Sequence, residues 1–237
     1  GSRQNIDQLL ESKVNSAFVQ TSDLVNKDKR IKVIATLFPE YLHAVVRGHS
    51  GLHNFADIKG KKISVGPQFS GSSKSAQSIL NVLGLAKWEY TIAAHDLGQS
   101  CDALSNKDID ALLYFGGGPI PSIGKMARCE QIRFLSLTPK QQLRLTSRFS
   151  FLEATEIPSG LYWGVAKTPT VAMYAKWVTR ADMPDEEIKK LTASFYHPKT
   201  QKFLKTHFPH LNLVSAEESF KQNGKDLHPG ALLYYQE

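Results

Sequence analysis

The 237-residue sequence contains little cysteine and no long apolar run. No stretch approaches the roughly 18 consecutive apolar residues that a membrane-spanning helix needs. Its start, Gly1-Ser2-Arg3, does not resemble a signal peptide, so we expect that any targeting segment was removed or never present. The two cysteines, Cys101 and Cys129, allow at most one disulfide. Their expected places in consecutive helices permit contact, but their spacing alone does not decide whether they are joined.

Nucleotide-binding motifs are also missing. Gly66 and Gly71 have the spacing of a phosphate-binding Walker loop, but Ser72 stands where that loop requires lysine. The run Gly116-Gly117-Gly118-Pro119-Ile120-Pro121 begins like a dinucleotide fingerprint, but a proline occupies the position of the third small residue. A tight turn after a buried strand is therefore favoured over a cofactor site, and we expect no cofactor.

The histidines and cysteines do not form a convincing catalytic or metal-binding set. His49 and His53, and likewise His207 and His210, have metal-like spacing, but a glycine or a proline interrupts each pair and no third ligand is near. Cys101 has no clear base beside it, and no GxSxG elbow is present. The sequence therefore indicates a binding protein without a metal, rather than an enzyme.

Negative charge is outnumbered, with 22 Asp and Glu against 29 Lys and Arg and a net charge of +7. Such a surplus suits nucleic acid, membrane headgroups or acidic solutes. The basic residues are scattered and show no interleaving of arginine with aromatic residues, so we expect no nucleic-acid partner. A solvated surface is the preferred interpretation.

The hydrophobic pattern alternates strands with helices. We expect strands at 16–19, 31–37, 42–47, 62–65, 89–93, 109–115, 132–137 and 171–178, with Pro39 separating the second from the third. We expect helices at 5–12, 21–27, 72–83, 99–104, 122–128, 184–195, 201–206 and 216–221. Repeated strand–helix units of this length predict an α/β fold with a doubly wound sheet.

One strand-to-helix turn is suited to an anion. Strand 62–65 leads through Gly66 to the cluster Ser70, Gly71, Ser72 and Ser73, where helix 72–83 begins. The first N–H groups of a helix have no intrahelical partner and favour negative charge. We expect this turn to bind a carboxylate; the alternative is that these serines only cap the helix. The turn Gly116, Gly117, Gly118 and Pro119 ends a neighbouring strand and faces the same crevice.

Several motifs in a fixed order resemble the TAXI group of solute receptors, the substrate-binding subunits of TRAP transporters. They are FPEYLHAVVR at 38–47, FADIKGKKISVG at 55–66, SGS at 70–72, DIDA at 108–111 with Gly117 and Pro119, IPSGLY at 157–162, VTRAD at 178–182, and LHPGA at 227–231 with Tyr234, Tyr235 and Glu237. The resemblance covers essentially the whole chain.

The resemblance implies a two-lobe, periplasmic binding protein type II-like fold, with a doubly wound mixed sheet flanked by helices in each lobe. By analogy, lobe I is residues 1–60 plus 166–237 and lobe II is residues 61–165. The implied protein is exported to the periplasm with its signal segment removed, is monomeric, and delivers a small organic anion or amino acid to a TRAP permease. Glutamate, glutamine and dicarboxylates are typical solutes of the family.

Further site residues follow from the same resemblance. Tyr162 is expected to form a wall over the carbon chain of the solute, and Gln20 and Asp23 are expected to contact it from the opposite lobe. For Asp23, a helix-capping role is the alternative. Two features depart from the family: we expect its first strand and loop to be absent before Asn5, by truncation or as a natural variant, and Leu161 stands where the family often has a small hydroxyl residue. The rival functions are an interaction protein built on a truncated receptor fold and, less favoured, a small-molecule enzyme.

Overall fold

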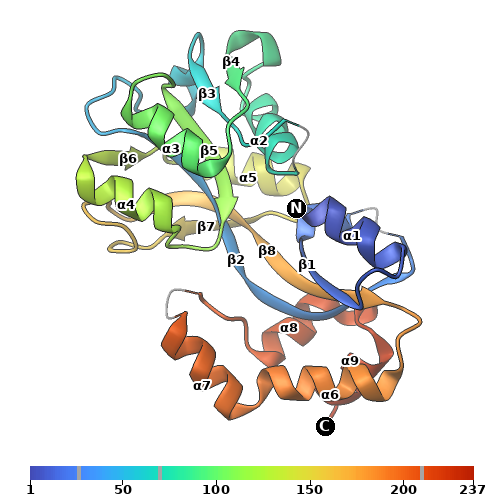
Figure 1. Cartoon of the computed structure of the whole chain (residues 1–237). Helices are drawn as coiled ribbons and strands as arrows, with labels where there is room; N and C mark the ends of the chain where they lie inside the picture. The colour runs from blue at the N-terminus through green and yellow to red at the C-terminus, as the bar shows by residue number, and fades with distance from the viewer. Residues whose placement is uncertain (26–27, 69–70, 209–210) are drawn as a thin grey trace. The chain divides into compact units, whose positions relative to one another are not determined.

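The computed structural model describes residues 1–25, 28–68, 71–208 and 211–237, and the chain forms two compact units (Figure 1). Unit 1 comprises Gly1–Pro39 and Tyr174–Glu237, and unit 2 comprises Glu40–Met173. Both crossings lie inside long strands, β2 (Ile31–Arg47) and β8 (Thr168–Arg180). The lobe boundaries near residues 60 and 166, which the resemblance implies, stay a prediction. A boundary within a continuous strand has no linker composition that a sequence could display.

Unit 2 is built on three parallel strands, β3 (Lys62–Ser64), β4 (Thr91–Ala93) and β5 (Ala111–Gly116). β3 pairs in parallel with both of the others. β5 also pairs with β2 in antiparallel register, and β6 (Ile132–Phe134) pairs with the end of β2. β7 (Glu153–Ile157) pairs with the start of β8 in antiparallel register. The sheet is therefore mixed, as predicted.

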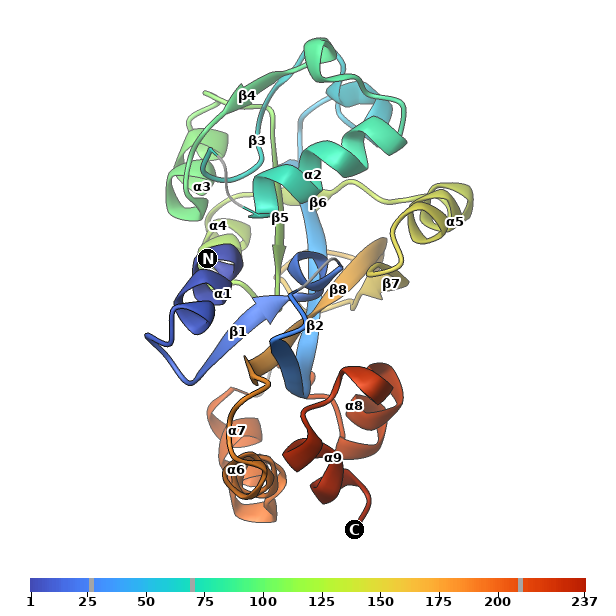
Figure 2. The same cartoon turned by 90° about the vertical axis from the view of Figure 1, so that its right-hand side faces the viewer.

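Helices cover both faces of this sheet. Leu113 of β5 packs in a core with α2 (Gly71–Val82) and α5 (Pro139–Arg148). Its neighbour Leu112 packs in a second core with α3 (Leu97–Ser105) and α4 (Pro121–Cys129). Successive side chains of a strand point to opposite faces, and Figure 2 shows the two helix pairs on opposite sides of β5. This arrangement confirms the predicted mixed sheet flanked by helices.

Unit 1 has its own core, formed by β1 (Ser16–Gln20), the end of β8, the start of β2 and the surrounding helices. These helices are α1 (Ser2–Leu10), α6 (Asp185–Tyr196), α7 (Pro198–His207), α8 (Ala216–Asn223) and α9 (Pro229–Tyr235). α6 and α9 approach most closely at Gly230, where an added Cβ would lie 2.1 Å from the backbone oxygen of Asp185. A side chain at position 230 would therefore force the two helices apart.

Several elements differ from the sequence prediction. Pro39 does not split β2, because the registered pairing with β5 begins at Tyr41 and needs no N–H group from the proline. The predicted helix 21–27 is a 3₁₀ turn, η1 (Thr21–Leu24), and its last two residues lie outside the described ranges. α5, β7 and α9 were not predicted. Short 3₁₀ turns complete the fold: η2 (Phe55–Ile58), η3 (Lys87–Glu89) and η4 (Gly224–Asp226). Within the described ranges, no helix has the length and apolar composition needed to cross a membrane.

Candidate functional site

The carboxyl ends of β3, β4 and β5 point toward the same edge of the sheet in unit 2, with β5 extending beyond Leu112 to Gly116. The register places Ser64 opposite both Ala93 and Leu112, and all three strands run in the same direction. Each strand leads into a helix: β3 into α2, β4 into α3 and β5 into α4. Three helix amino termini, with their orphan N–H groups, therefore follow from the same edge. We call this region the carboxyl edge of unit 2.

The turn from β3 to α2 carries the serine cluster that the sequence singled out. Gly71 is the first residue of α2, Ser72 is half-buried, and Ser73 is only 4% exposed. The Ser73 hydroxyl accepts a hydrogen bond of 3.0 Å from the Gln77 side chain, so it is already engaged within its own helix. Ser70 lies outside the described residues. Gly71 and Ser72 therefore remain the accessible members of this turn.

A hydroxyl chain joins the end of β3 to the start of α3. The Ser64 and Ser100 Oγ atoms are 2.7 Å apart, and the Ser100 hydroxyl donates to the Asp96 carbonyl at 2.6 Å. Asp96 caps α3 by accepting a hydrogen bond from the Gln99 N–H group. The amino end of α3 is thus held against β3.

His95 stands between β4 and this cap and was not identified from the sequence. Its ring is half-buried, and its Nδ1 atom is buried without a hydrogen-bond partner among the described residues. A buried ring nitrogen without a partner is uncommon, because its desolvation is not compensated. The available signal was its position, immediately after a short strand and before the capping box that starts at Asp96.

The turn from β5 to α4 holds Gly116, Gly117, Gly118 and Pro119. A Cβ atom on Gly116 would lie 2.9 Å from the Tyr114 ring, and one on Gly118 would lie 2.5 Å from Leu161 Cδ2. A larger residue at either position would therefore have to displace a neighbouring side chain. α4 has no side-chain cap at its amino terminus. The first N–H groups of α4 are thus not satisfied by a capping side chain.

Tyr162 is buried against this turn and forms a hydrogen bond with it. Its side chain is 2% exposed. Its hydroxyl accepts a hydrogen bond of 2.8 Å from the Ile120 N–H group and lies 2.9 Å from His43 Nε2. A residue buried in this way holds the loop before α4 in place, and its expected role as a wall over the carbon chain of a solute stays a prediction.

His43 is fully buried beneath the same turn. Its Nδ1 atom lies 2.9 Å from the Tyr41 carbonyl, which can only accept, so the ring proton is on Nδ1. Nε2 is then an acceptor, and the Tyr162 hydroxyl donates to it. Burial lowers the pKa of His43 to about 4, so the ring is neutral at physiological pH. The Ile120–Tyr162–His43 chain of hydrogen bonds is therefore fully matched in donors and acceptors.

Gln20 and Asp23 belong to unit 1 and are not part of the carboxyl edge of unit 2. Gln20 is the last residue of β1, and its N–H group donates to the Ser2 hydroxyl at 3.1 Å. Asp23 is half-buried in η1. That either residue contacts a solute stays a prediction.

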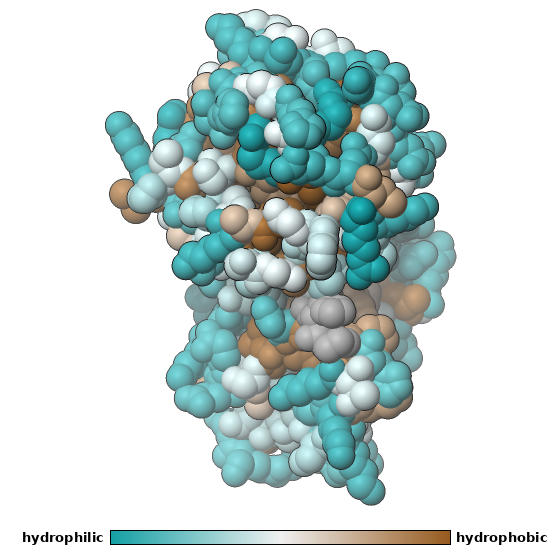
Figure 3. All heavy atoms as spheres, turned by 90° about the vertical axis from the view of Figure 1, so that its left-hand side faces the viewer, coloured by the Kyte–Doolittle hydropathy of each residue, from teal (hydrophilic) through white to brown (hydrophobic). Residues whose placement is uncertain are grey.

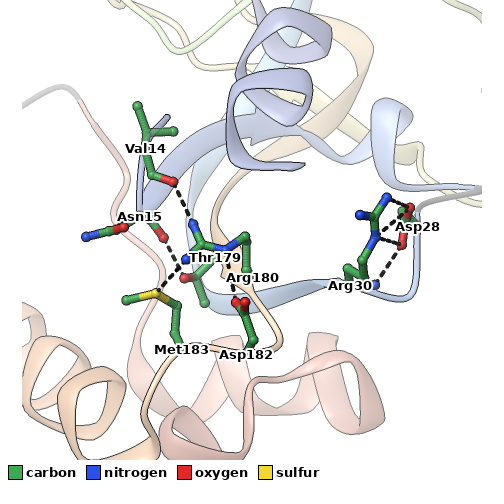
Figure 4. Close-up of polar contacts among 8 residues, drawn as sticks. All are labelled: Val14, Asn15, Asp28, Arg30, Thr179, Arg180, Asp182 and Met183. Atoms are coloured by element: carbon green, nitrogen blue, oxygen red, sulfur yellow. Dashed lines mark hydrogen bonds and ion pairs between the residues drawn. The ribbon is translucent and has the colours of Figure 1, made fainter. Parts of the chain in front are cut away.

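Unit 1 carries a separate depression of about 340 Å³, lined by Leu10, Ser12, Arg30, Arg180, Ala181 and Asp182. Figure 4 shows that both arginines are already paired with acids: Arg30 with Asp28, and Arg180 with Asp182. Hydrogen bonds from Arg30 lower the pKa of Asp28 to about 2. Within each pair the acid offsets the charge of the arginine, so these four residues give the depression no net positive charge.

The two cysteines are the remaining candidates for chemistry. Cys101 is buried and Cys129 is exposed, and both are free thiols. Burial raises the pKa of Cys101 to about 11, which disfavours the nucleophilic thiolate. Within the described part of the chain, no group of three or more His, Cys, Asp or Glu side chains is arranged to hold a metal ion.

The fold resembles that of several solved structures, one of which is a periplasmic binding protein. The periplasmic aliphatic sulphonate binding protein SsuA from Escherichia coli is 11% identical, with a TM-score of 0.54 over 100% of this chain and 69% of that one. PhnD1 from Prochlorococcus marinus, in complex with methylphosphonate, is 14% identical, with a TM-score of 0.56 over 93% and 79%. XAC2383 from Xanthomonas citri, bound to chloride, is 13% identical, with a TM-score of 0.56 over 99% and 83%.

These solved structures show the fold of the chain, and a family model shows the family to which it belongs. The model of the NMT1-like family matches residues 1–237, which is the whole chain. The chain therefore belongs to the NMT1-like family.

Proposed function

We propose that the protein is a solute receptor that binds a small organic anion at the carboxyl edge of unit 2, without making or breaking a covalent bond. One observation carries the proposal: three parallel strands point toward this edge, and each leads into the start of a helix. Ligands of open α/β sheets bind at such edges.

The groups at this edge suit a carboxylate. The uncapped start of α4 and the Gly71–Ser72 start of α2 supply N–H and hydroxyl donors, and the positive ends of the helix dipoles favour an anion. His95 Nδ1, buried and without a partner among the described residues, adds a polar atom that a solute can satisfy. The three solved structures compared above hold or are named for a sulphonate, a phosphonate and chloride, and this common anionic character supports the proposal.

We further infer a TAXI-type receptor of a TRAP transporter, exported to the periplasm, with glutamate, glutamine or a related dicarboxylate as solute. The support is the ordered series of sequence motifs, among them SGS at 70–72 and LHPGA at 227–231, together with membership of the NMT1-like family. A TRAP permease is the corresponding partner.

Isothermal titration calorimetry with L-glutamate, L-glutamine and 2-oxoglutarate tests the proposal. We expect Ser72→Ala and His95→Ala each to weaken binding of the best solute by about tenfold, as for a lost hydrogen bond to a charged group. Ser78→Ala and His53→Ala are matched controls, because both residues are exposed in the same unit. Unchanged affinity in both test variants would refute the assignment of the solute site to the carboxyl edge of unit 2. A folded protein that binds no acid of the set would favour the interaction protein instead.

A further inference from the structure

α7 is a helix that packs weakly against the rest of the protein. None of the residues from Pro198 to His207 is buried. Phe203 is 55% exposed, and Phe208, the residue that ends the helix, is 49% exposed. Exposed phenyl rings on a helix without a buried face are unusual, because apolar burial is what normally stabilises a surface helix. This helix therefore presents apolar surface to something other than its own core.

The charge around α7 has a single sign. No aspartate or glutamate occurs from Ile188 to Ala216. The side chains of Lys199, Lys202 and Lys205 are exposed and form no ion pair or hydrogen bond with any residue that the structure describes. Acidic partners are available to some other lysines of unit 1, as in Lys189 with Glu237 and Lys221 with Glu217. The three α7 lysines thus form a local excess of positive charge.

Lys199 shares one row of the helix with the exposed phenyl ring of Phe203, while Lys202 and Lys205 lie on other parts of the exposed surface of α7. Lys199, Phe203 and His207 are spaced by four residues, so they form one row. The Phe203 and His207 rings stack with centroids 4.0 Å apart, and Lys202 precedes Phe203 directly. Figure 3 views the side of the molecule on which α7 lies, and in its lower part hydrophilic side chains adjoin a hydrophobic area. The exposed row therefore combines a lysine with an aromatic ring, and two more lysines lie on the same helix.

We propose that α7 docks the protein on the surface of an anionic membrane. A basic helix with aromatic side chains is suited to the boundary between lipid headgroups and acyl chains. Lysine stems lie along apolar surface while the ammonium groups reach the headgroup phosphates. A lipid surface accepts phenyl rings without a preformed pocket, whereas a protein partner would need one. This inference is independent of the proposed solute site in unit 2.

Co-sedimentation with large unilamellar vesicles tests the docking. The wild-type chain is expected to bind vesicles of phosphatidylglycerol and phosphatidylcholine in equal parts, and to bind pure phosphatidylcholine vesicles at least tenfold more weakly. The triple variant K199Q/K202Q/K205Q should bind the anionic vesicles about 100-fold more weakly, from about fivefold per lysine. Phe203→Ser should weaken binding several-fold through the lost apolar contact.

A matched control keeps net charge from explaining the result. K62Q/K87Q/K107Q removes the same charge from exposed lysines of unit 2, and we expect it to retain most of the binding. Equal loss in both triple variants, equal binding to neutral vesicles, or no binding to anionic vesicles at low salt would each overturn the proposal. The last outcome would point to an acidic protein partner. Solute affinity should be unchanged in every variant, so failure here leaves the solute site unaffected.

Discussion

The hydroxyl of Tyr162 offers a sharp test of how the turn before α4 is held. Tyr162→Phe keeps the ring and removes only the oxygen. The edge-on contacts of the ring with His43 and Phe134, at centroid distances of 5.6 and 5.3 Å, remain possible. The change therefore isolates two hydrogen bonds from the packing around them.

The magnitude follows from what the variant leaves unsatisfied. The Ile120 N–H group loses its acceptor, and His43 Nε2 loses its donor, inside a buried cluster. A buried polar group without a partner costs about 1–3 kcal/mol. Together they should lower the free energy of unfolding of unit 2 by about 2–6 kcal/mol. Opening of the turn should also speed hydrogen exchange at the Ile120 amide.

Urea denaturation and amide hydrogen exchange measure these effects, and Tyr90→Phe is the matched control. Tyr90 is 7% exposed in the same unit, and its hydroxyl forms no hydrogen bond with the described residues. We expect Tyr90→Phe to change the free energy of unfolding by less than about 0.5 kcal/mol. If Tyr162→Phe were equally mild and left the Ile120 amide protected, the hydrogen-bond chain would not hold the turn.

Two further predictions concern stability. Because the pKa of His43 is about 4 when folded and about 6.5 when unfolded, the unfolded state takes up a proton first as the pH falls. The contribution is full above pH 6.5 and should be lost between pH 6.5 and 4, by up to about 3 kcal/mol, as measured by urea denaturation across that range; a flat profile would contradict it. Gly230→Ala places a Cβ 2.1 Å from the Asp185 carbonyl oxygen and should destabilise unit 1 by about 1–3 kcal/mol or more in thermal denaturation. Gly51→Ala, with no atom within 4 Å of its added Cβ, is the control, and equal melting temperatures would refute the close crossing.

The elements that were predicted well are those whose signals are local. The strand at Lys62–Ser64 and the helix that begins at Gly71 are separated by a glycine turn, and their positions follow from short-range pattern alone. β2 shows the opposite case. Pro39 is a local signal for a strand end, but its cost depends on whether a partner strand needs the missing N–H group. The neighbours of β2 in the strand order of the sheet are β5 and β8, both distant in sequence, and the register with β5 begins only at Tyr41.

The site residues show the same dependence on distant contacts. Leu161, Tyr162 and Trp163 are three consecutive large apolar residues, yet Tyr162 is buried while Trp163 is 77% exposed. Which of these side chains is buried depends on distant contacts. Tyr162 contacts His43, which lies 119 residues earlier in the chain, and Leu161 packs against Gly118. His95 escaped notice for a related reason, because only the folded chain reveals that its Nδ1 atom is buried without a partner among the described residues.

Two surfaces of this protein are suited to negative charge, and they use different physics. At the carboxyl edge of unit 2 the donors are backbone amides and hydroxyls, which act over hydrogen-bond distances and depend on their fixed geometry. On α7 the donors are three mobile ammonium groups in water, whose attraction acts over longer range and is screened by salt. Raising the ionic strength from about 0.05 to about 0.5 M shortens the Debye length roughly threefold. It should therefore release α7 from anionic vesicles while changing solute affinity little. If solute binding weakened in parallel with vesicle binding, the carboxyl edge of unit 2 would not be the solute site.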